Sequence, residues 1–69
     1  SEFEKNIYLA AQALKSPDST VKTKQLRGHS FTQSMSRPTF FRALQALEEK
    51  GLIARSGSKK IGLFMVKAS

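Results

Sequence analysis

An apolar stripe of helical period over residues 36–50 constrains the fold of this chain more than any other feature of its sequence. Phe40, Leu44 and Leu47 stand at positions i, i+4 and i+7. Residues at this spacing share one face of an α-helix, and the polar residues between them fall on the opposite face. A helix with a single apolar face must bury that face against other elements. The rest of this short chain is therefore expected to pack around the helix.

Signals at both ends of the stripe set the limits of this helix. Ser36, or alternatively Ser34, is a suitable N-cap, and Pro38 is tolerated in the first turn, where its missing N–H has no intrahelical partner. Gly51 stands where a residue in the left-handed conformation ends a helix. Adjacent acids at 48 and 49 lie at the wrong end for the helix dipole. This is either a minor cost or an indication that Lys50 or another base pairs with one of them.

Two strand-like runs follow the helix. Residues 52–55 and 60–67 are rich in apolar and β-branched side chains, and a Ser-Gly-Ser turn separates them. Two such runs around a glycine turn predict an antiparallel hairpin. Phe64 and Val66 fall on one face of the second run, and Leu63 and Met65 fall on the other. We expect one of these faces to be well covered and the other to be partly covered.

The first half of the chain predicts shorter elements. Apolar residues at 3, 7, 10, 11 and 14 indicate an amphipathic helix that Pro17 brings to an end. A brief strand is expected at 20–22, and Thr23 resembles the N-cap of a short helix with Leu26 as its inward anchor. In the polar connector that follows, the Phe31 side chain is expected to be buried in the core.

These elements predict one α+β domain, mainly α, over residues 1–69. The first three residues resemble a cloning remnant, and we interpret the chain as part of a longer protein. A domain of this size is only marginally stable unless its core is well organised. The expected core comprises Ile7, Leu14, Leu26, Phe40, Leu44, Leu47, Leu52 and Leu63.

Charge narrows the functional classes. The chain has 12 Lys and Arg against 5 acids, for a net charge of +7. No acid lies between residues 19 and 47 or after residue 49. Such an excess attracts polyanions, although many small domains are basic only for solubility. There is no cysteine and a single histidine, so we expect no metal, cofactor, small-molecule ligand or enzymatic activity. Neither a membrane span nor a signal peptide is visible.

The segment SRPTFFRALQALEEKGLIARSG, residues 36–57, resembles the recognition helix and wing of winged helix-turn-helix domains. Bacterial members commonly carry Ser-Arg-x-Thr-φ-x-Arg-x-Leu-x-x-Leu-Glu-x-x-Gly-Leu-Ile there. The resemblance implies three helices with a C-terminal two-stranded β-hairpin wing. It also implies that helix 36–50 enters the major groove of double-stranded DNA and that the wing, residues 52–66, contacts the adjacent backbone.

Several residues of the helix are candidate DNA contacts. Arg37 and Arg42 can bind phosphate or a guanine edge, against a solvated side chain or a surface ion pair as the alternative. Gln45 can bind adenine, although it stands far along the helix. Thr39 either binds phosphate or supports the cap. Phe41 is either an apolar pad against the DNA backbone or a second core residue, and the core is favoured.

Basic residues outside the helix extend this candidate interface. In the wing, Arg55, Lys59 and Lys60 are candidate phosphate contacts, although charged hairpins also serve to block edge aggregation. Lys24 and Arg27 belong to the second helix, which crosses the DNA backbone in helix-turn-helix docking.

The expected function is sequence-specific DNA binding. The domain would belong to a transcription regulator or to a plasmid or phage replication or partition protein, with a homodimer formed through other segments. It would act in the bacterial cytoplasm at the nucleoid, or in a eukaryotic nucleus. The alternative is a winged helix that binds a protein partner, which needs no basic recognition helix.

Overall fold

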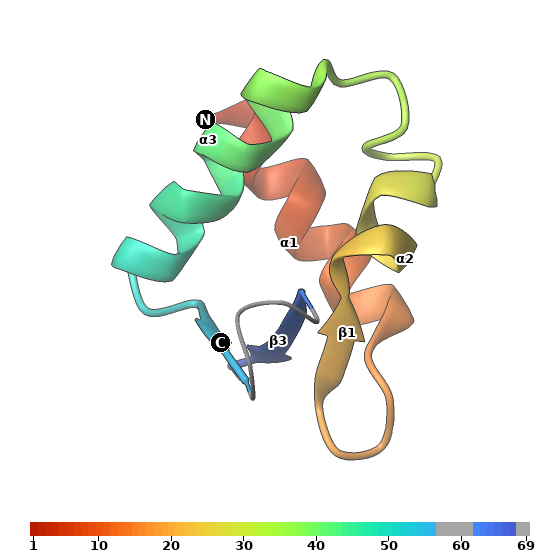
Figure 1. Cartoon of the computed structure of the whole chain (residues 1–69), viewed down its shortest axis with the longest axis vertical. Coiled ribbons are helices and arrows are strands. Elements are labelled where there is room, and N and C mark those ends of the chain that lie inside the picture. The colour runs from red at the N-terminus through yellow and green to blue at the C-terminus, as the bar shows by residue number, and fades with distance from the viewer. Residues whose placement is uncertain (57–61, 68–69) are drawn as a thin grey trace.

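Three helices pack on one side of a small antiparallel sheet in the computed structural model, which describes residues 1–56 and 62–67 (Figure 1). The arrangement is that of a small α+β domain, as expected. The elements in chain order are α1 (Glu2–Leu14), β1 (Thr20–Lys22), α2 (Thr23–Gly28), α3 (Arg37–Glu49), β2 (Ile53–Arg55) and β3 (Leu63–Val66).

Local signals place α3 as predicted. The Ser36 side chain accepts a hydrogen bond from the Thr39 N–H at 3.3 Å, so Ser36 rather than Ser34 is the N-cap. Gly51 has a φ of +78° in the left-handed region, which lets the chain leave the helix without the steric strain a side chain would meet. Phe40 and Leu44 face inward with the rest of the stripe, which packs against α1.

The sheet has one strand more than the predicted hairpin. β3 pairs antiparallel with β2, as expected, and also with β1, which gives the order β1-β3-β2. β3 is therefore the central strand, with Phe64 and Val66 buried on its inner face. On the outer face Met65 is exposed. The predicted Ser-Gly-Ser turn lies largely in residues 57–61, outside the described residues.

The buried core joins all the helices to the sheet, but its membership differs from the prediction. Leu14, Leu52 and Leu63 are half-buried, because they lie at the end of α1, just beyond α3 and on the outer face of β3. Two alanines of α1 contribute instead, where their small side chains let α1 approach its neighbours. The buried apolar residues are Ile7, Ala10, Ala11, Val21, Leu26, Phe40, Ala43, Leu44, Leu47, Ile53, Phe64 and Val66.

The prediction that Phe31 plugs the core is wrong. Its side chain is 48% exposed and stacks edge-on against the His29 ring, with 4.6 Å between the ring centroids. Thr32, only 2% exposed, takes the buried position, and its hydroxyl donates to the Leu26 carbonyl. The last carbonyls of a helix lack intrahelical hydrogen-bond partners. Just after α2, a buried side chain that donates a hydrogen bond is therefore favoured over an aromatic ring.

Thr23 is the first residue of α2 and not its N-cap, because β1 runs directly into the helix. Its N–H and its hydroxyl both donate to the Gly62 carbonyl, each at 2.7 Å. Gly62 has a φ of +57°, and a Cβ at this position would lie 2.9 Å from the Thr23 hydroxyl oxygen. This close approach ties the start of α2 to the start of β3.

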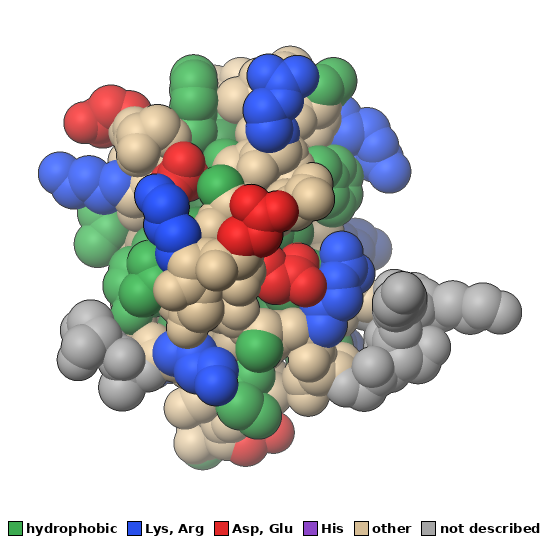
Figure 2. All heavy atoms as spheres, turned by 90° about the vertical axis from the view of Figure 1, so that its left-hand side faces the viewer, with side chains coloured by type: hydrophobic (Ala, Val, Ile, Leu, Met, Phe, Trp, Pro, Cys, Tyr) green, Lys and Arg blue, Asp and Glu red, His purple; other side chains and the backbone are tan. Residues whose placement is uncertain are grey.

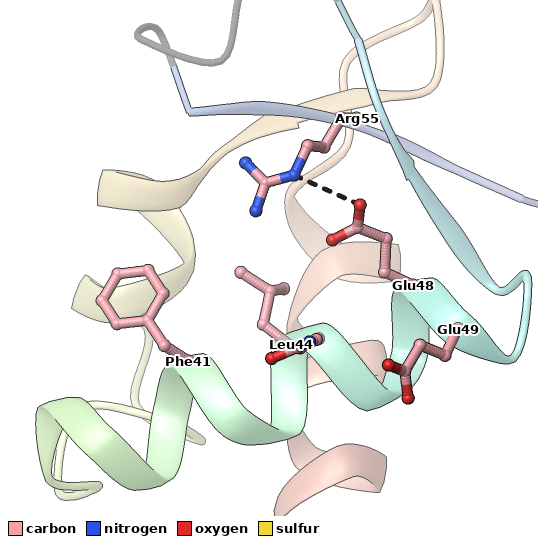
Figure 3. A pocket seen from close by; sticks show the side chains of 6 residues that line it. Phe41, Leu44, Glu48, Glu49 and Arg55 are labelled. Atoms are coloured by element: carbon pink, nitrogen blue, oxygen red, sulfur yellow. Dashed lines mark hydrogen bonds and ion pairs between the residues drawn. The ribbon is translucent and has the colours of Figure 1, made fainter.

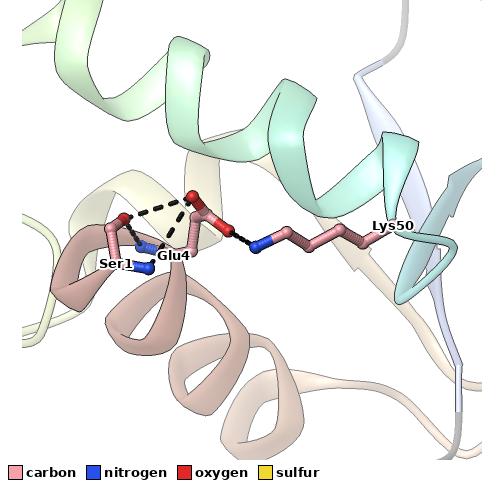
Figure 4. Close-up of polar contacts among 3 residues, drawn as sticks. All are labelled: Ser1, Glu4 and Lys50. Atoms are coloured by element: carbon pink, nitrogen blue, oxygen red, sulfur yellow. Dashed lines mark hydrogen bonds and ion pairs between the residues drawn. The ribbon is translucent and has the colours of Figure 1, made fainter.

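An ion pair links the first turn of α1 to the end of α3 (Figure 4). Lys50 Nζ lies 2.5 Å from Glu4 Oε1, and Ser1 Oγ accepts from the Glu4 N–H at 3.3 Å. The Lys50 ammonium is the main reason that the pKa of Glu4 is lowered from its ordinary value. The pair fixes the two packed helices at their exposed edge.

Candidate nucleic-acid interface

The exposed face of α3 is basic in its first half and acidic in its last turn. Arg37, Arg42 and Gln45 are exposed, and no acid occurs in the first turn. Glu48 and Glu49 follow at the other end. Figure 2 views this side of the molecule and shows acidic side chains near the centre with Lys and Arg side chains around them. A polyanion would therefore be attracted to the first half of the helix.

An aromatic side chain joins two arginines from different helices. The Arg37 guanidinium carbon lies 5.1 Å from the centroid of the Phe41 ring, and that of Arg27, from α2, lies 5.7 Å from it. Both distances are within the range of cation–π attraction. We call Arg27, Arg37 and Phe41 the arginine–phenylalanine cluster. It brings the charge of α2 next to the start of α3.

Phe41 is not a core residue, contrary to the interpretation favoured from the sequence. Its side chain is 36% exposed and packs edge-on against the buried Phe40, with 5.1 Å between centroids. Consecutive helical residues point about 100° apart, and here Phe40 points into the core while Phe41 points to its edge. Phe41 thus lies at the rim of the helix interface, where its ring stays partly open to solvent.

The other candidate residues of α3 differ in their surroundings. Arg42 is exposed, beside a shallow hollow that Phe3 and Ala46 also line, and it forms no ion pair within the described part of the chain. Thr39 is half-buried, and its hydroxyl accepts from Ser36 Oγ at 2.9 Å. These contacts agree with the second of the two roles considered for Thr39, which is support of the helix cap.

A groove of about 500 Å³ lies between α3 and β2 (Figure 3). Arg55 Nε donates to Glu48 Oε2 at 3.2 Å, so this arginine is partly neutralised and directed into the groove. A base does pair with one of the two adjacent acids, but it is Arg55, because Lys50 pairs with Glu4. The lining residues are Phe41, Leu44, Gln45, Glu48, Glu49 and Arg55.

The remaining basic candidates are only partly placed. Lys24 is exposed on α2, one turn before Arg27. Lys59 and Lys60 lie outside the described residues. Residues 1–56 and 62–67 contain no group of three or more His, Asp or Glu side chains that could hold a metal ion. None of the helices in these ranges combines the length and the apolar character that crossing a membrane requires.

Sequence reasoning missed the two contacts that organise this surface. Nothing in the spacing of Arg27 and Phe41 signals their contact, because it depends on how α2 packs beside α3. Glu48 and Arg55 are seven residues apart, but Gly51 reverses the chain between them, so the pairing depends on the angle of that turn.

Comparison with known proteins adds no identification, since no protein-family model, curated protein or solved structure matches this chain. The function is therefore argued from the site.

Proposed function

We propose that this chain is a double-stranded DNA-binding domain of the winged helix-turn-helix type. In this proposal α3 is the recognition helix in the major groove, and the β2–β3 pair is the wing beside it. The observation that carries the proposal is the acid-free, basic first half of α3, joined to α2 through the arginine–phenylalanine cluster. A cationic surface of this kind matches the phosphates that border a groove.

The packing of α3 supports this role. The helix buries its apolar stripe against α1, so its polar face is available to a partner along its length. Its 13 residues extend over about 20 Å, and a helix fits the major groove, which is about 12 Å wide. The order of the elements, α1-β1-α2-α3-β2-β3, is compatible with the arrangement that the resemblance implies, in which a strand pair follows the third helix.

Each basic element has a distinct part in the proposed complex. Arg37 and Arg42 project from the exposed face of α3, where they reach base edges or the flanking phosphates. Lys24 on α2 contacts the backbone as that helix crosses it. Free N–H groups and the positive end of the helix dipole at the start of α3 favour a phosphate there as well. The domain would serve transcription, replication or partition at a bacterial nucleoid or in a nucleus.

Paired charge removals on two faces test the proposal. A duplex is first enriched from a random-sequence pool by the wild-type protein, and its affinity is compared with that of random duplex by fluorescence anisotropy. Arg37→Ala and Arg42→Ala should each weaken the enriched site by ~1–3 kcal/mol where the arginine grips a guanine, and weaken random duplex less. The control variant, Lys5→Ala with Lys15→Ala, removes charge from α1 and should leave the ratio of the two affinities unchanged.

Two results would overturn the proposal, once circular dichroism has shown that each variant is folded. If the wild-type protein binds no duplex, this surface is not a DNA interface, and a protein partner becomes the better hypothesis. If both arginine variants lose affinity equally for enriched and random duplex, α3 is not a recognition helix and the surface acts only as a non-specific clamp.

A further inference from the structure

The guanidinium of Arg55 is held in one direction by two contacts. Glu48 accepts from its Nε at 3.2 Å, and the guanidinium carbon lies 5.3 Å from the centroid of the Phe64 ring. Figure 3 shows this side chain extending from β2 into the space above Leu44, with Glu48 on one side and Phe41 across the groove. Arginine has five N–H donors, and among the residues that the structure describes only the one on Nε has a hydrogen-bond partner. Within that part of the chain, the four donors on the two Nη atoms form no hydrogen bond.

The stability of the domain gives little reason for this pair. Glu48 is 29% exposed and Arg55 is 48% exposed, and ion pairs as exposed as these contribute about 0–1 kcal/mol. Glu48 also opposes the dipole in the last turn of α3 and lowers the attraction of this face for any phosphate. An acid that adds little stability and weakens general attraction has a clearer role in selecting how DNA binds.

We propose that Glu48 is a specificity-determining positioning residue that acts through Arg55. A free arginine can contact any nearby phosphate, so it raises the affinity for every DNA sequence equally. An arginine fixed by Glu48 presents its Nη donors in one direction, so it is satisfied only where an acceptor of the duplex lies at the matching place. The carboxylate repels phosphates that approach in other registers. This inference rests on the proposed function, and it concerns selectivity where the proposed function concerns binding.

Glu48 and Glu49 form a matched pair for the test, because both lie in the last turn of α3 and both line the groove, but only Glu48 contacts Arg55. Glu48→Ala and Glu49→Ala each remove one negative charge, so both should tighten binding to random duplex, and Glu48→Ala should do so more because it also frees Arg55. Only Glu48→Ala should lower the ratio of enriched-site to random affinity, by about three- to tenfold, which is less than the loss of a whole guanine contact.

An Arg55→Ala background isolates the route through the arginine. There, adding Glu48→Ala should change the ratio no further. In the free protein, the Arg55 Nε–H resonance should lose its protection from solvent exchange in Glu48→Ala and keep it in Glu49→Ala. Should Glu48→Ala melt below the assay temperature, Glu48→Met, which keeps the side-chain length and removes both the charge and the oxygen acceptor, replaces it.

The outcomes separate this inference from the proposed function. If the wild-type protein selects a duplex but the two glutamate variants show the same ratio, Glu48 has no positioning role and DNA binding still stands. The same conclusion follows if Glu48→Ala lowers the ratio equally without Arg55. If the wild-type protein binds no duplex or selects none, the proposed function fails and this inference fails with it.

Discussion

Replacement of Phe41 by leucine is the most informative single change in the arginine–phenylalanine cluster. Leucine keeps an apolar side chain at the rim of α3 but has no π face for the two guanidinium groups. Arg27 and Arg37 lie 5.7 Å and 5.1 Å from this ring, and each such contact at an exposed site contributes about 0.5–1 kcal/mol. Their loss should lower the free energy of unfolding by about 1–2 kcal/mol. In a domain of this size, each kcal/mol of lost stability lowers the melting temperature by roughly 4–8 °C.

The effect on DNA binding follows from the same contacts. Without the ring, Arg37 must be ordered by the DNA itself, at about 0.5–1.5 kcal/mol for a long side chain, whereas Arg27 still lies 5.6 Å from the centroid of the Phe40 ring. The binding free energy should therefore weaken by about 0.5–1.5 kcal/mol. The dependence on salt should not change, because the number of cations at the interface is the same. Phe41→Tyr, which keeps the ring, should bind DNA as the wild-type protein does.

Anisotropy titrations at several salt concentrations, below the melting temperature of each variant, measure both quantities. If Phe41→Leu binds duplex as tightly as the wild-type protein, the ring does not orient the arginines. If it binds more weakly with a shallower salt dependence, the variant has lost a phosphate contact outright, and the reasoning from orientation is wrong.

Three further predictions concern stability. Leu44→Ala should cost ~2–5 kcal/mol by opening a cavity in the core, and an unchanged thermal melt by circular dichroism would contradict its inward position. Thr32→Val keeps the side-chain shape but removes the donor to the Leu26 carbonyl, so the urea midpoint should fall by the equivalent of about 1 kcal/mol, and an equal or higher midpoint would refute that role. Because the Lys50 ammonium lowers the pKa of Glu4 from 4.5, their ion pair stabilises the fold above that pH and is lost as the pH falls through the lowered pKa. The melting temperature of Glu4→Gln should therefore fall less between pH 6 and pH 3 than that of the wild-type protein. An identical fall would show that the Glu4 carboxylate does not cause the acid sensitivity.

Local chemistry explains why much of the fold could be predicted from the sequence. The limits of α3 depend on Ser36, the buried stripe and Gly51, and each acts within a turn or two of the chain. The same holds for α1 and for the pairing of β2 with β3, which follow from periodicity and from the short distance between the two strands in the sequence. Such signals need no knowledge of distant residues.

Contacts between distant residues could not be predicted in this way. β1 is three residues long and pairs with β3 more than forty positions later in the chain, so its place in the sheet depends on how α2 and α3 pack between them. Hydrophobicity alone predicts that Phe31 lies in the core, whereas the buried residue is Thr32, whose hydroxyl donates to the Leu26 carbonyl alongside the His29 N–H. The candidate site was predicted as a set of charges. Its organisation through Phe41 and Glu48 required the tertiary structure.

The salt dependence of duplex binding in two triple variants tests the central claim most directly. Lys24, Arg37 and Arg42 lie on the proposed interface, and Lys5, Lys15 and Lys67 are exposed elsewhere, so alanine at each set removes the same charge. If the first set neutralises three phosphates, its removal should make the slope of log K against log salt shallower by about 2.7, since each contact contributes about 0.9. Removal of the second set should leave the slope unchanged. Equal changes in both variants, or a wild-type affinity that does not respond to salt, would contradict the assignment of this surface to DNA.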